Sequence, residues 1–263
     1  MIKAGIAGDE APKAYFPTVV GYSKYDRLPG SDGKNCLIGE DAIAKKGVLT
    51  LKYPLENGIV KKWEDMEKIW RYTYFDQLKT DPEQHPVLLT EAALNPKDNK
   101  EKTLEIFFDE FKVPAYYVFT QAVLALYSSG RTTGLVCDSG DGVTHIVVVY
   151  DGYSIKHAVN RLNIAGRNLT EYISKHLAED GVQFDSTADK EVAKQIKEKL
   201  CYCALDFEKE IEEFHQNKEK KKKFTLPDSK EVSVGDVCIR TPECLFKPAM
   251  LGMDVPGIHE AIY

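Results

Sequence analysis

Two apolar runs between residues 135 and 150 are interrupted by a cluster of carboxylates and glycines. The segment reads LVCDSGDGVTHIVVVY, and its interruption consists of Asp138, Ser139, Gly140, Asp141 and Gly142. Apolar runs of this length on both sides of a polar turn predict a β-hairpin. A tight hairpin turn needs only one or two residues that tolerate unusual backbone angles. The extra carboxylate and glycine therefore raise the question whether this turn also has a chemical role.

Two interpretations of the turn need no phosphate. In the first, Asp and Gly simply supply the backbone angles of a long hairpin turn. In the second, Asp-Ser-Gly after an apolar strand belongs to an aspartic protease, whose mechanism needs two carboxylates that share a proton. The chain has no second Asp-Ser-Gly or Asp-Thr-Gly, which disfavours the protease.

The third interpretation is a phosphate-binding turn. Consecutive backbone N–H groups in a glycine-rich turn form a concave site for an anion, and glycine lets the backbone approach a phosphate closely. Asp138 at the strand end could hold Mg²⁺ through its water shell, with Asp141 oriented beside it. A divalent cation between carboxylates and phosphate explains why acidic residues stand next to amides suited to an anion.

Composition limits the protein classes that are compatible with this turn. The 263 residues carry a formal net charge of −6, which disfavours a nucleic-acid-binding role, and the length predicts two domains or one large one. No stretch approaches the roughly 18 apolar residues of a membrane span, and the first residues lack the apolar core of a secretory signal. We interpret the 6 cysteines as reduced thiols of a cytosolic protein. The CxC pair at 201–203 lacks the partners of a zinc site.

The elements that must position the turn follow from periodicity and turn residues. In the first half we expect a strand at 14–20, an exposed mobile loop at 21–35, a helix at 63–78, a buried strand in 85–96, a helix at 100–113, and a strand that leads into a helix ending at Gly130. In the second half we expect a three-stranded meander over 134–159 with a turn at Asp151-Gly152, a helix capped near Asn168, one long helix or two abutting ones over 188–214, and strands near 224–228 and 231–235. The lysine run at 218–223 predicts a solvated loop, because like charges repel; the alternative is a patch that binds an acidic partner.

Several motifs in one order resemble the actin family. They are KAGIAGDEAP, LTLKYPLENGIV, DMEKIW, LLTEAALNPKDNK, SSGRTTG, DSGDGVTH, IKEKLCYCALDFE and GIHE. The resemblance covers nearly the whole chain, apart from a divergent loop at 21–37 and the lysine run. The stretch LLTEAALNP is similar to actin and its close relatives rather than to sugar kinases or chaperone ATPases, which share only the fold.

The resemblance implies an α/β, actin-like ATPase fold with two ribonuclease-H-like domains around a nucleotide cleft, incomplete at both termini. The expected domains are 1–128, with a small outer subdomain at 18–53 that carries the mobile loop 21–37, and 129–263, with an outer helical subdomain at 165–253. It further implies binding of ATP or ADP with Mg²⁺ or Ca²⁺, slow hydrolysis by in-line attack of water, and polymerisation into filaments. The expected partners are further copies of the chain and actin-binding proteins, in the cytoplasm and cytoskeleton.

Individual site residues are carried over from the resemblance. Asp138 anchors the hydrated metal, and contacts to phosphates and ribose come from Gly140, Asp141, Gly142 and Val143. Gln121 positions the attacking water, and His145 orients it and relays protons. The remaining nucleotide contacts are Lys3 at the β- and γ-phosphates, Gly166, and Lys197 and Glu198 at the adenine. Lys194 replaces an arginine, which keeps the charge but loses the planar fork.

These residues also have simpler interpretations without the family. Gln121 could cap a helix, and His145 within a strand is typical of a core histidine whose ring nitrogens are satisfied. Lys3 near a terminus is typical of a solvated lysine, and Lys197 with Glu198 of an exposed helix pair.

The chain also departs from the family pattern. The first Asp-x-Gly-x-Gly turn that precedes KAGxAGD in actins is missing, as is the segment that follows GIHE. We therefore expect a partial gene model, a truncated product or a decayed copy that folds poorly alone. The alternative function is an actin-derived remnant or regulatory binding protein without ATPase or polymerisation activity. Smaller departures are Asn57, which replaces a histidine, and Asn163 and Asn168, which replace aspartates.

Overall fold

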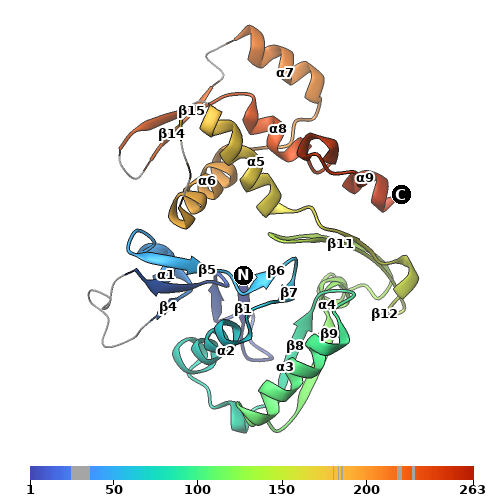
Figure 1. The fold of residues 1–263 in the computed structure, drawn as a ribbon. Helices are drawn as coiled ribbons and strands as arrows, with labels where there is room; N and C mark the ends of the chain where they lie inside the picture. The colour runs from blue at the N-terminus through green and yellow to red at the C-terminus, as the bar shows by residue number, and fades with distance from the viewer. Residues whose placement is uncertain (25–35, 180, 183, 185, 218–220, 227–228) are drawn as a thin grey trace. The chain divides into compact units, whose positions relative to one another are not determined.

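The fold is known from a computed structural model of the chain (Figure 1), which describes residues 1–263 except 25–35, 180, 183, 185, 218–220 and 227–228. The chain divides into two compact units. Unit 1 contains residues 1–136 and 147–159, and unit 2 contains 137–146 and 160–263. The mixed helix and strand content agrees with the expected α/β class. The domain limits 1–128 and 129–263 and the two outer subdomains stay predictions.

Unit 1 contains short strands and four α-helices in its described residues. Its strands are β1 (Ile2–Ala4), β2 (Ala14–Phe16), β3 (Val20–Ser23), β4 (Cys36–Ile38), β5 (Leu49–Lys52), β6 (Leu55–Glu56), β7 (Ile59–Val60), β8 (Val87–Glu91), β9 (Tyr116–Thr120) and β12 (Tyr153–Ser154). Its helices are α1 (Glu40–Ala44), α2 (Trp63–Arg71), α3 (Lys97–Asp109) and α4 (Gln121–Ser128), with a π-helix at Tyr72–Leu78 and short 3₁₀ turns at Pro82–Gln84 and Lys156–Ala158.

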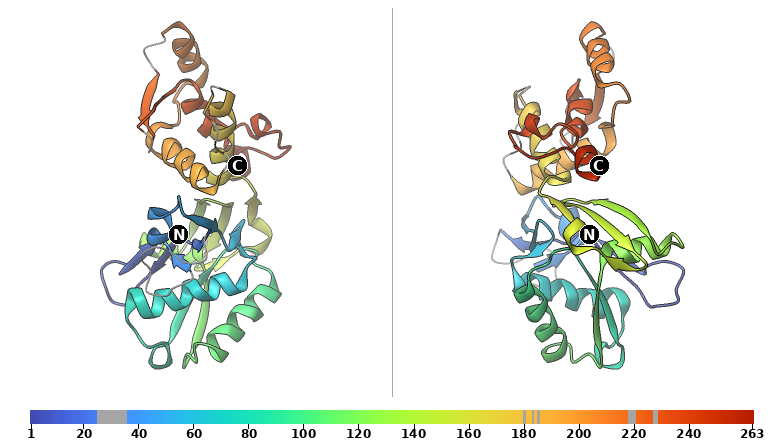
Figure 2. Two further views of the ribbon diagram at one scale, coloured as in Figure 1. Left: turned by 60° about the vertical axis from the view of Figure 1, so that its left-hand side comes forward. Right: turned by 90° about the vertical axis from the view of Figure 1, so that its right-hand side faces the viewer.

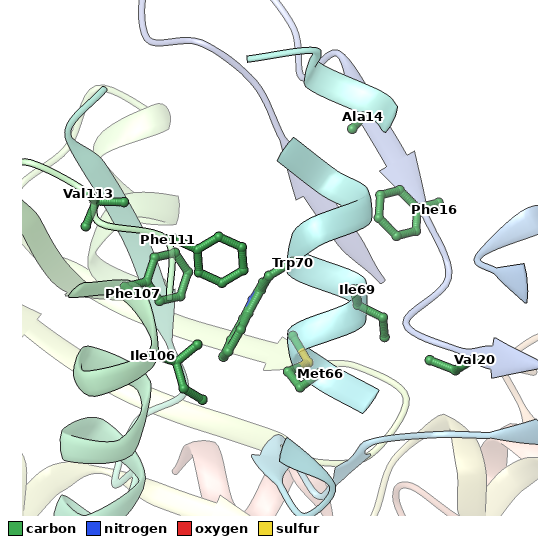
Figure 3. Packing of buried hydrophobic residues seen from close by; sticks show 10 residues of the cluster. All are labelled: Ala14, Phe16, Val20, Met66, Ile69, Trp70, Ile106, Phe107, Phe111 and Val113. Carbon is green, nitrogen blue, oxygen red and sulfur yellow. The ribbon is translucent and has the colours of Figure 1, made fainter. Parts of the chain in front are cut away.

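The main core of unit 1 forms around α2. Met66, Ile69 and Trp70 recur at the 3- and 4-residue spacing that places side chains on one face of a helix, and all three are buried. Figure 3 shows the Trp70 side chain beside Phe107 of α3. The centroids of the two rings are 5.0 Å apart. Because aromatic side chains bury large apolar areas, this contact fixes α2 against α3.

Several expected elements of unit 1 have different limits in the structure. The expected strand at 14–20 is two strands, β2 and β3, which belong to different sheets. The expected helix at 63–78 changes from α-helix to π-helix at Tyr72. The expected buried strand is half exposed, because Leu88 and Thr90 of β8 face outward. The loop expected at 21–37 is shorter in the structure, because β3 extends to Ser23 and β4 begins at Cys36. Its centre, 25–35, lies outside the described residues.

One sheet contains the hairpin of residues 135–150 that carries the Asp- and Gly-rich turn. Its strands β10 (Gly134–Ser139), β11 (Thr144–Tyr150) and β12 follow one another, and β13 (Asn160–Leu162) also pairs with β11. The expected third strand at 153–159 is therefore only β12, followed by a 3₁₀ turn and then β13. The turn at Asp151-Gly152 is confirmed: both residues have positive φ values, 47° and 82°, as a two-residue type I′ hairpin turn requires.

Unit 2 adds helices around a second core. Its further elements are α5 (Gly166–Glu179), α6 (Thr187–Leu200), α7 (Phe207–Gln216), β14 (Lys222–Thr225), β15 (Glu231–Val234), α8 (Val237–Glu243) and α9 (Ile258–Ile262), with a 3₁₀ turn at Pro248–Leu251. Buried Ile173 and Leu177 of α5 pack with Val192 and Ile196 of α6 and with Ile239 of α8. Figure 2 shows the same grouping of helices from two sides. This core fixes α5 and α6, which carry predicted site residues.

The helix limits of unit 2 follow from local signals. The span 188–214 is two helices rather than one, because α6 ends at Leu200 and α7 starts at Phe207. A capping box starts α6: the Ser186 side chain accepts from the Asp189 amide, and the Asp189 side chain accepts from the Ser186 amide. Asn168 lies in the first turn of α5, where its Oδ1 accepts from the Ala165 amide at 3.1 Å. The helix therefore begins two residues before Asn168, which is not its N-cap residue but still accepts a hydrogen bond at the helix start.

The end of the lysine run is strand rather than loop. Lys222 and Lys223 belong to β14, whereas residues 218–220 lie outside the described part. The Lys222 ammonium donates to the Leu200 carbonyl at 3.1 Å and lies 4.2 Å from the centroid of the Tyr202 ring. Lys223 pairs with Glu231 across the hairpin at 2.9 Å. The loop prediction is therefore wrong for these two residues, because the strand hairpin extends into the run, although Lys223 is exposed as expected.

Two general features complete the fold. Cys36, Cys137, Cys201, Cys203, Cys238 and Cys244 are all free thiols. None of the helices formed by the described residues combines the length and the apolar character that a membrane crossing requires.

Candidate functional site

The turn between β10 and β11 is closed by its own backbone. The Gly140 amide donates to the Val143 carbonyl at 3.1 Å, so residues 140–143 form a short, defined loop. Asp138 is half-buried near the end of β10, and Asp141 is exposed at the tip. Both carboxylates therefore belong to one rigid turn that leads directly into the buried strand β11.

The glycines of this turn are not explained by backbone angles. Neither Gly140 nor Gly142 has a positive φ, whereas other glycines of the chain do. A Cβ added to Gly140 would meet only the Val143 carbonyl oxygen at 3.9 Å, an ordinary contact. Left-handed backbone angles and crowding by neighbouring atoms therefore do not account for glycine at position 140.

Hydroxyl groups connect the turn to the buried core of unit 2. Ser139 Oγ lies 2.8 Å from Thr144 Oγ1, and the Thr144 hydroxyl donates to the Ile164 carbonyl at 2.7 Å. Thr144 is fully buried and Ile164 is a core residue. Because a buried hydroxyl is costly to leave without a partner, this chain of hydrogen bonds fixes both ends of the turn.

The start of α5 lies directly against the turn. The amide of Gly166 donates to the Gly140 carbonyl at 3.0 Å, and the amide of Arg167 donates to the Asp141 carbonyl at 2.7 Å. The Arg167 guanidinium also pairs with Asp141 Oδ2 at 3.3 Å. A Cβ on Gly166 would lie 3.3 Å from the Gly140 carbonyl oxygen, so glycine permits this close approach.

Three predicted site residues lie along one side of α6. Lys194, Lys197 and Glu198 are spaced so that their side chains lie near one another on the helix. Lys197 donates from Nζ to the Gly166 carbonyl at 2.8 Å, which brings it to the turn. Burial lowers the pKa of the Lys197 ammonium, while the carboxylates of Asp141 and Glu198 act to raise it. Lys194 instead pairs with buried Glu191 at 3.6 Å.

His145 follows the turn as a core residue. It is 5% exposed, and on β11 it stands in register with Arg161 of β13. This burial confirms the core position of the histidine, whereas the expectation that both ring nitrogens are satisfied is not confirmed. Its predicted role in orienting water stays a prediction.

Lys3 and Gln121 belong to unit 1 and are described there. Lys3 lies on β1, where its ammonium is 5.8 Å from the centroid of the Tyr15 ring of β2. Gln121 is the exposed first residue of α4, after Thr120 as the N-cap position. The hairpin, Gly166 and the α6 residues are thus brought together within unit 2, and Lys3 and Gln121 are not part of that group.

The metal predicted at Asp138 would need few protein ligands. Among the described residues, no group of three or more His, Cys, Asp or Glu side chains could hold a metal ion. Mg²⁺ commonly uses one or two carboxylates together with waters and phosphate oxygens of its ligand. A single carboxylate at the end of β10 beside the turn amides fits that mode of binding.

Arg167 is a site residue that sequence reasoning missed. Its partner Asp141 is 26 residues away, and the pair forms only because α5 starts against the turn. The same applies to Thr144, which reads as a strand residue until its contacts with Ser139 and Ile164 are known. An arginine that directly follows a glycine at a helix start was the available signal, but it did not identify the partner.

Comparison with known families identifies the family of the chain. The chain has the mixed sheets and helices of an α/β nucleotide-binding class, and a family model described as Actin matches residues 1–263, the whole chain. The chain therefore belongs to the actin family. Proteins of this family typically bind a nucleotide with a divalent cation, and the family has ATPase-type activity in general.

Proposed function

We propose that the chain binds ATP or ADP with Mg²⁺ through the β10–β11 turn, hydrolyses ATP slowly and polymerises into filaments. The observation that carries the proposal is Gly140, whose glycine character the fold does not require and whose Cα borders open space. Backbone amides of such a turn suit the β- and γ-phosphates. Ca²⁺ is the alternative cation.

Each residue of the turn then has a distinct task. Asp138 holds the hydrated cation, and Gly140, Asp141, Gly142 and Val143 contact the phosphates and ribose. The cation, when bound, offsets the charge that develops on the transferred phosphoryl group. Ser139 and Thr144 keep the turn rigid, so the amides are already in place before the ligand arrives.

Further roles come from the family resemblance. Gly166, Lys194, Lys197 and Glu198 would contact the nucleoside. Gln121 and His145 would orient the attacking water, and Lys3 would reach the phosphates. With no strong base among these groups, hydrolysis is expected to be slow, and self-assembly with actin-binding proteins in the cytoskeleton is the proposed cellular role.

A charge-removing substitution tests nucleotide binding. In Asp138→Asn the carboxylate becomes an amide of the same shape, so we expect the Kd for Mg·ATP to rise about 10- to 100-fold, as when an oriented partner of a metal is lost. Without divalent cation the same variant should bind ATP as well as or better than wild type, because the removed charge repels the phosphates. Calorimetric titration with and without Mg²⁺ measures both values.

The matched control is Asp151→Asn at the other turn of β11. Asn tolerates the positive φ of this position, and the substitution removes the same charge away from the proposed site. An unchanged Mg·ATP affinity in Asp138→Asn, or an equal loss in the control, would remove the support for the metal role.

Assembly is tested separately by sedimentation under polymerising salt with Mg·ATP. Pelleting above a critical concentration, together with phosphate release that accompanies it, is the expected result. A soluble chain that binds Mg·ATP without pelleting at high concentration would rule out the filament role and leave a nucleotide-binding protein.

A further inference from the structure

The position of the turn depends on the first residues of α5. Two backbone amides of that helix, those of Gly166 and Arg167, donate to the carbonyls of Gly140 and Asp141 at 3.0 and 2.7 Å. These bonds orient the peptide units of the turn, so the amides that would face a phosphate are oriented by α5. Any group that fixes the start of α5 therefore also fixes the turn.

Lys197 is such a group. Its ammonium donates to the Gly166 carbonyl at 2.8 Å, and the same carbonyl accepts from the Thr170 hydroxyl at 3.0 Å. A Cβ on Gly166 would lie 3.2 Å from Lys197 Nζ, which shows how closely the Lys197 side chain approaches this peptide. A hydrogen bond from a charged donor in a half-buried place is stronger than a neutral one.

We propose that Lys197 is a positioning residue, which holds the phosphate-binding turn in place through the Gly166 carbonyl and the start of α5. Its effect on ATP binding rests on the function proposed above. The family resemblance assigns Lys197 to the border of the adenine; the contacts found here give it a second task that does not involve the base. The connection runs from α6 to α5 to the turn, and all of it lies within unit 2.

Hydrogen exchange of the free chain tests this connection without a nucleotide. In Lys197→Met the side chain keeps the unbranched apolar stem of lysine but loses the terminal ammonium donor, so exchange at the Gly166 and Arg167 amides should accelerate about tenfold or more. Lys197→Arg keeps a charged donor and should restore protection. Lys190→Met, which removes an exposed lysine from the first turn of the same helix, is the matched control and should leave both amides unchanged.

The exchange experiment has a clear opposing result. Equal exchange of the two amides in wild type, Lys197→Met and Lys190→Met would overturn the proposal. If Lys197→Met does not fold, Lys197→Gln is used instead, because its amide is one atom too short to make the same bond and the same acceleration is expected.

Two ligands separate positioning from direct contact with the base. Affinities for Mg·ATP and for Mg·ribose-5-triphosphate, which has no adenine, are compared by competition. A positioning role predicts that Lys197→Met weakens both by the same factor, about tenfold, the usual effect of one charge-assisted hydrogen bond. A loss confined to Mg·ATP would show that Lys197 acts on the adenine alone. If wild type binds neither ligand, the proposed function fails, while the exchange result still decides the connection.

Discussion

The two turns at the ends of β11 use glycine and aspartate for different reasons. At Asp151-Gly152 both residues have positive φ values, 47° and 82°, and the chain reverses in the smallest possible space. At Asp138–Val143 the turn is longer, and neither of its glycines has a positive φ. The Asp151-Gly152 turn therefore needs its glycine to form. The Asp138–Val143 turn contains Gly140 at a position where the fold would accept a side chain.

This difference is a way to recognise a functional turn. A residue type that the backbone requires says nothing about ligands. A glycine that a left-handed backbone does not require, next to a carboxylate that Arg167 of α5 pairs with, indicates a functional role for the turn. Gly166 is intermediate, because the close approach of the turn carbonyls accounts for it.

The largest expected effect in this comparison is on stability, at Gly152. Gly152→Ala forces a side chain into a left-handed conformation, and its Cβ would lie 2.2 Å from the Tyr127 hydroxyl oxygen. We expect a loss of about 2–3 kcal/mol in the free energy of unfolding, measured by urea denaturation. The same substitution in a Tyr127→Phe background should cost less, because the hydroxyl is gone. A loss below about 0.5 kcal/mol, the size of an ordinary surface change, would contradict the assigned role.

The next effect is on ligand affinity, at Gly140. Gly140→Ala adds a methyl group where the structure has open space, so unfolding should change by less than about 0.5 kcal/mol. Under the proposed function the same methyl group lies against the phosphates and should weaken Mg·ATP binding about tenfold, roughly the value of one lost hydrogen bond to a charged group. Stable protein with unchanged affinity would argue against a phosphate at this position.

The smallest effect concerns the electrostatics of the strand end. Burial raises the pKa of the Cys137 thiol above 9.0, and the neighbouring Asp138 carboxylate raises it further. A raised pKa means less thiolate at a given pH, and alkylation follows the thiolate. Asp138→Asn should therefore lower this pKa and speed alkylation of Cys137 about twofold at pH values below the pKa.

Mass spectrometry of the alkylated peptides gives the rate at each pH. Exposed Cys203 in the same sample is the internal control, and its rate should not change. Slower alkylation of Cys137 in Asp138→Asn would mean that the Asp138 carboxylate lowers the pKa of the thiol. That result would contradict the arrangement of the two side chains.

Elements with strong local signals could be predicted from the sequence. Apolar spacing located α2, α3 and α5, and the Asp-Gly pair located the turn after β11. Limits that depend on tertiary pairing could not be found in this way. Tyr153–Ala158 has a strand-like pattern, yet only Tyr153 and Ser154 pair with β11. The lysine run has the composition of a loop, yet Lys222 and Lys223 belong to a strand because they pair with β15.

The residues of the candidate site also divide into those with a local sequence signal and those that only tertiary packing brings together. The hairpin and its carboxylates were visible as a local cluster, because one short segment supplies them. Lys197, Gly166 and Arg167 converge on that cluster only through the packing of α5 and α6. The family resemblance supplied Lys197 and Gly166 as nucleotide contacts but not their hydrogen bond. Asn57, a departure from the family pattern, has a local reason: it lies at φ 48° before Gly58, where asparagine is favoured.

The π-helix at Tyr72–Leu78 has a consequence for how this chain tolerates changes in length. Each turn of such a helix accommodates one residue more than an α-helical turn, and π-helices occur mostly as local interruptions of α-helices. Deleting one residue there would let ordinary i→i−4 hydrogen bonding continue from α2. Pairing with β9 sets the register of the downstream strand β8. The loss of one residue would therefore be accommodated between the π-helix and β8, and the strand pairing would stay the same. This stretch is thus a natural place for homologous chains to differ by a single residue.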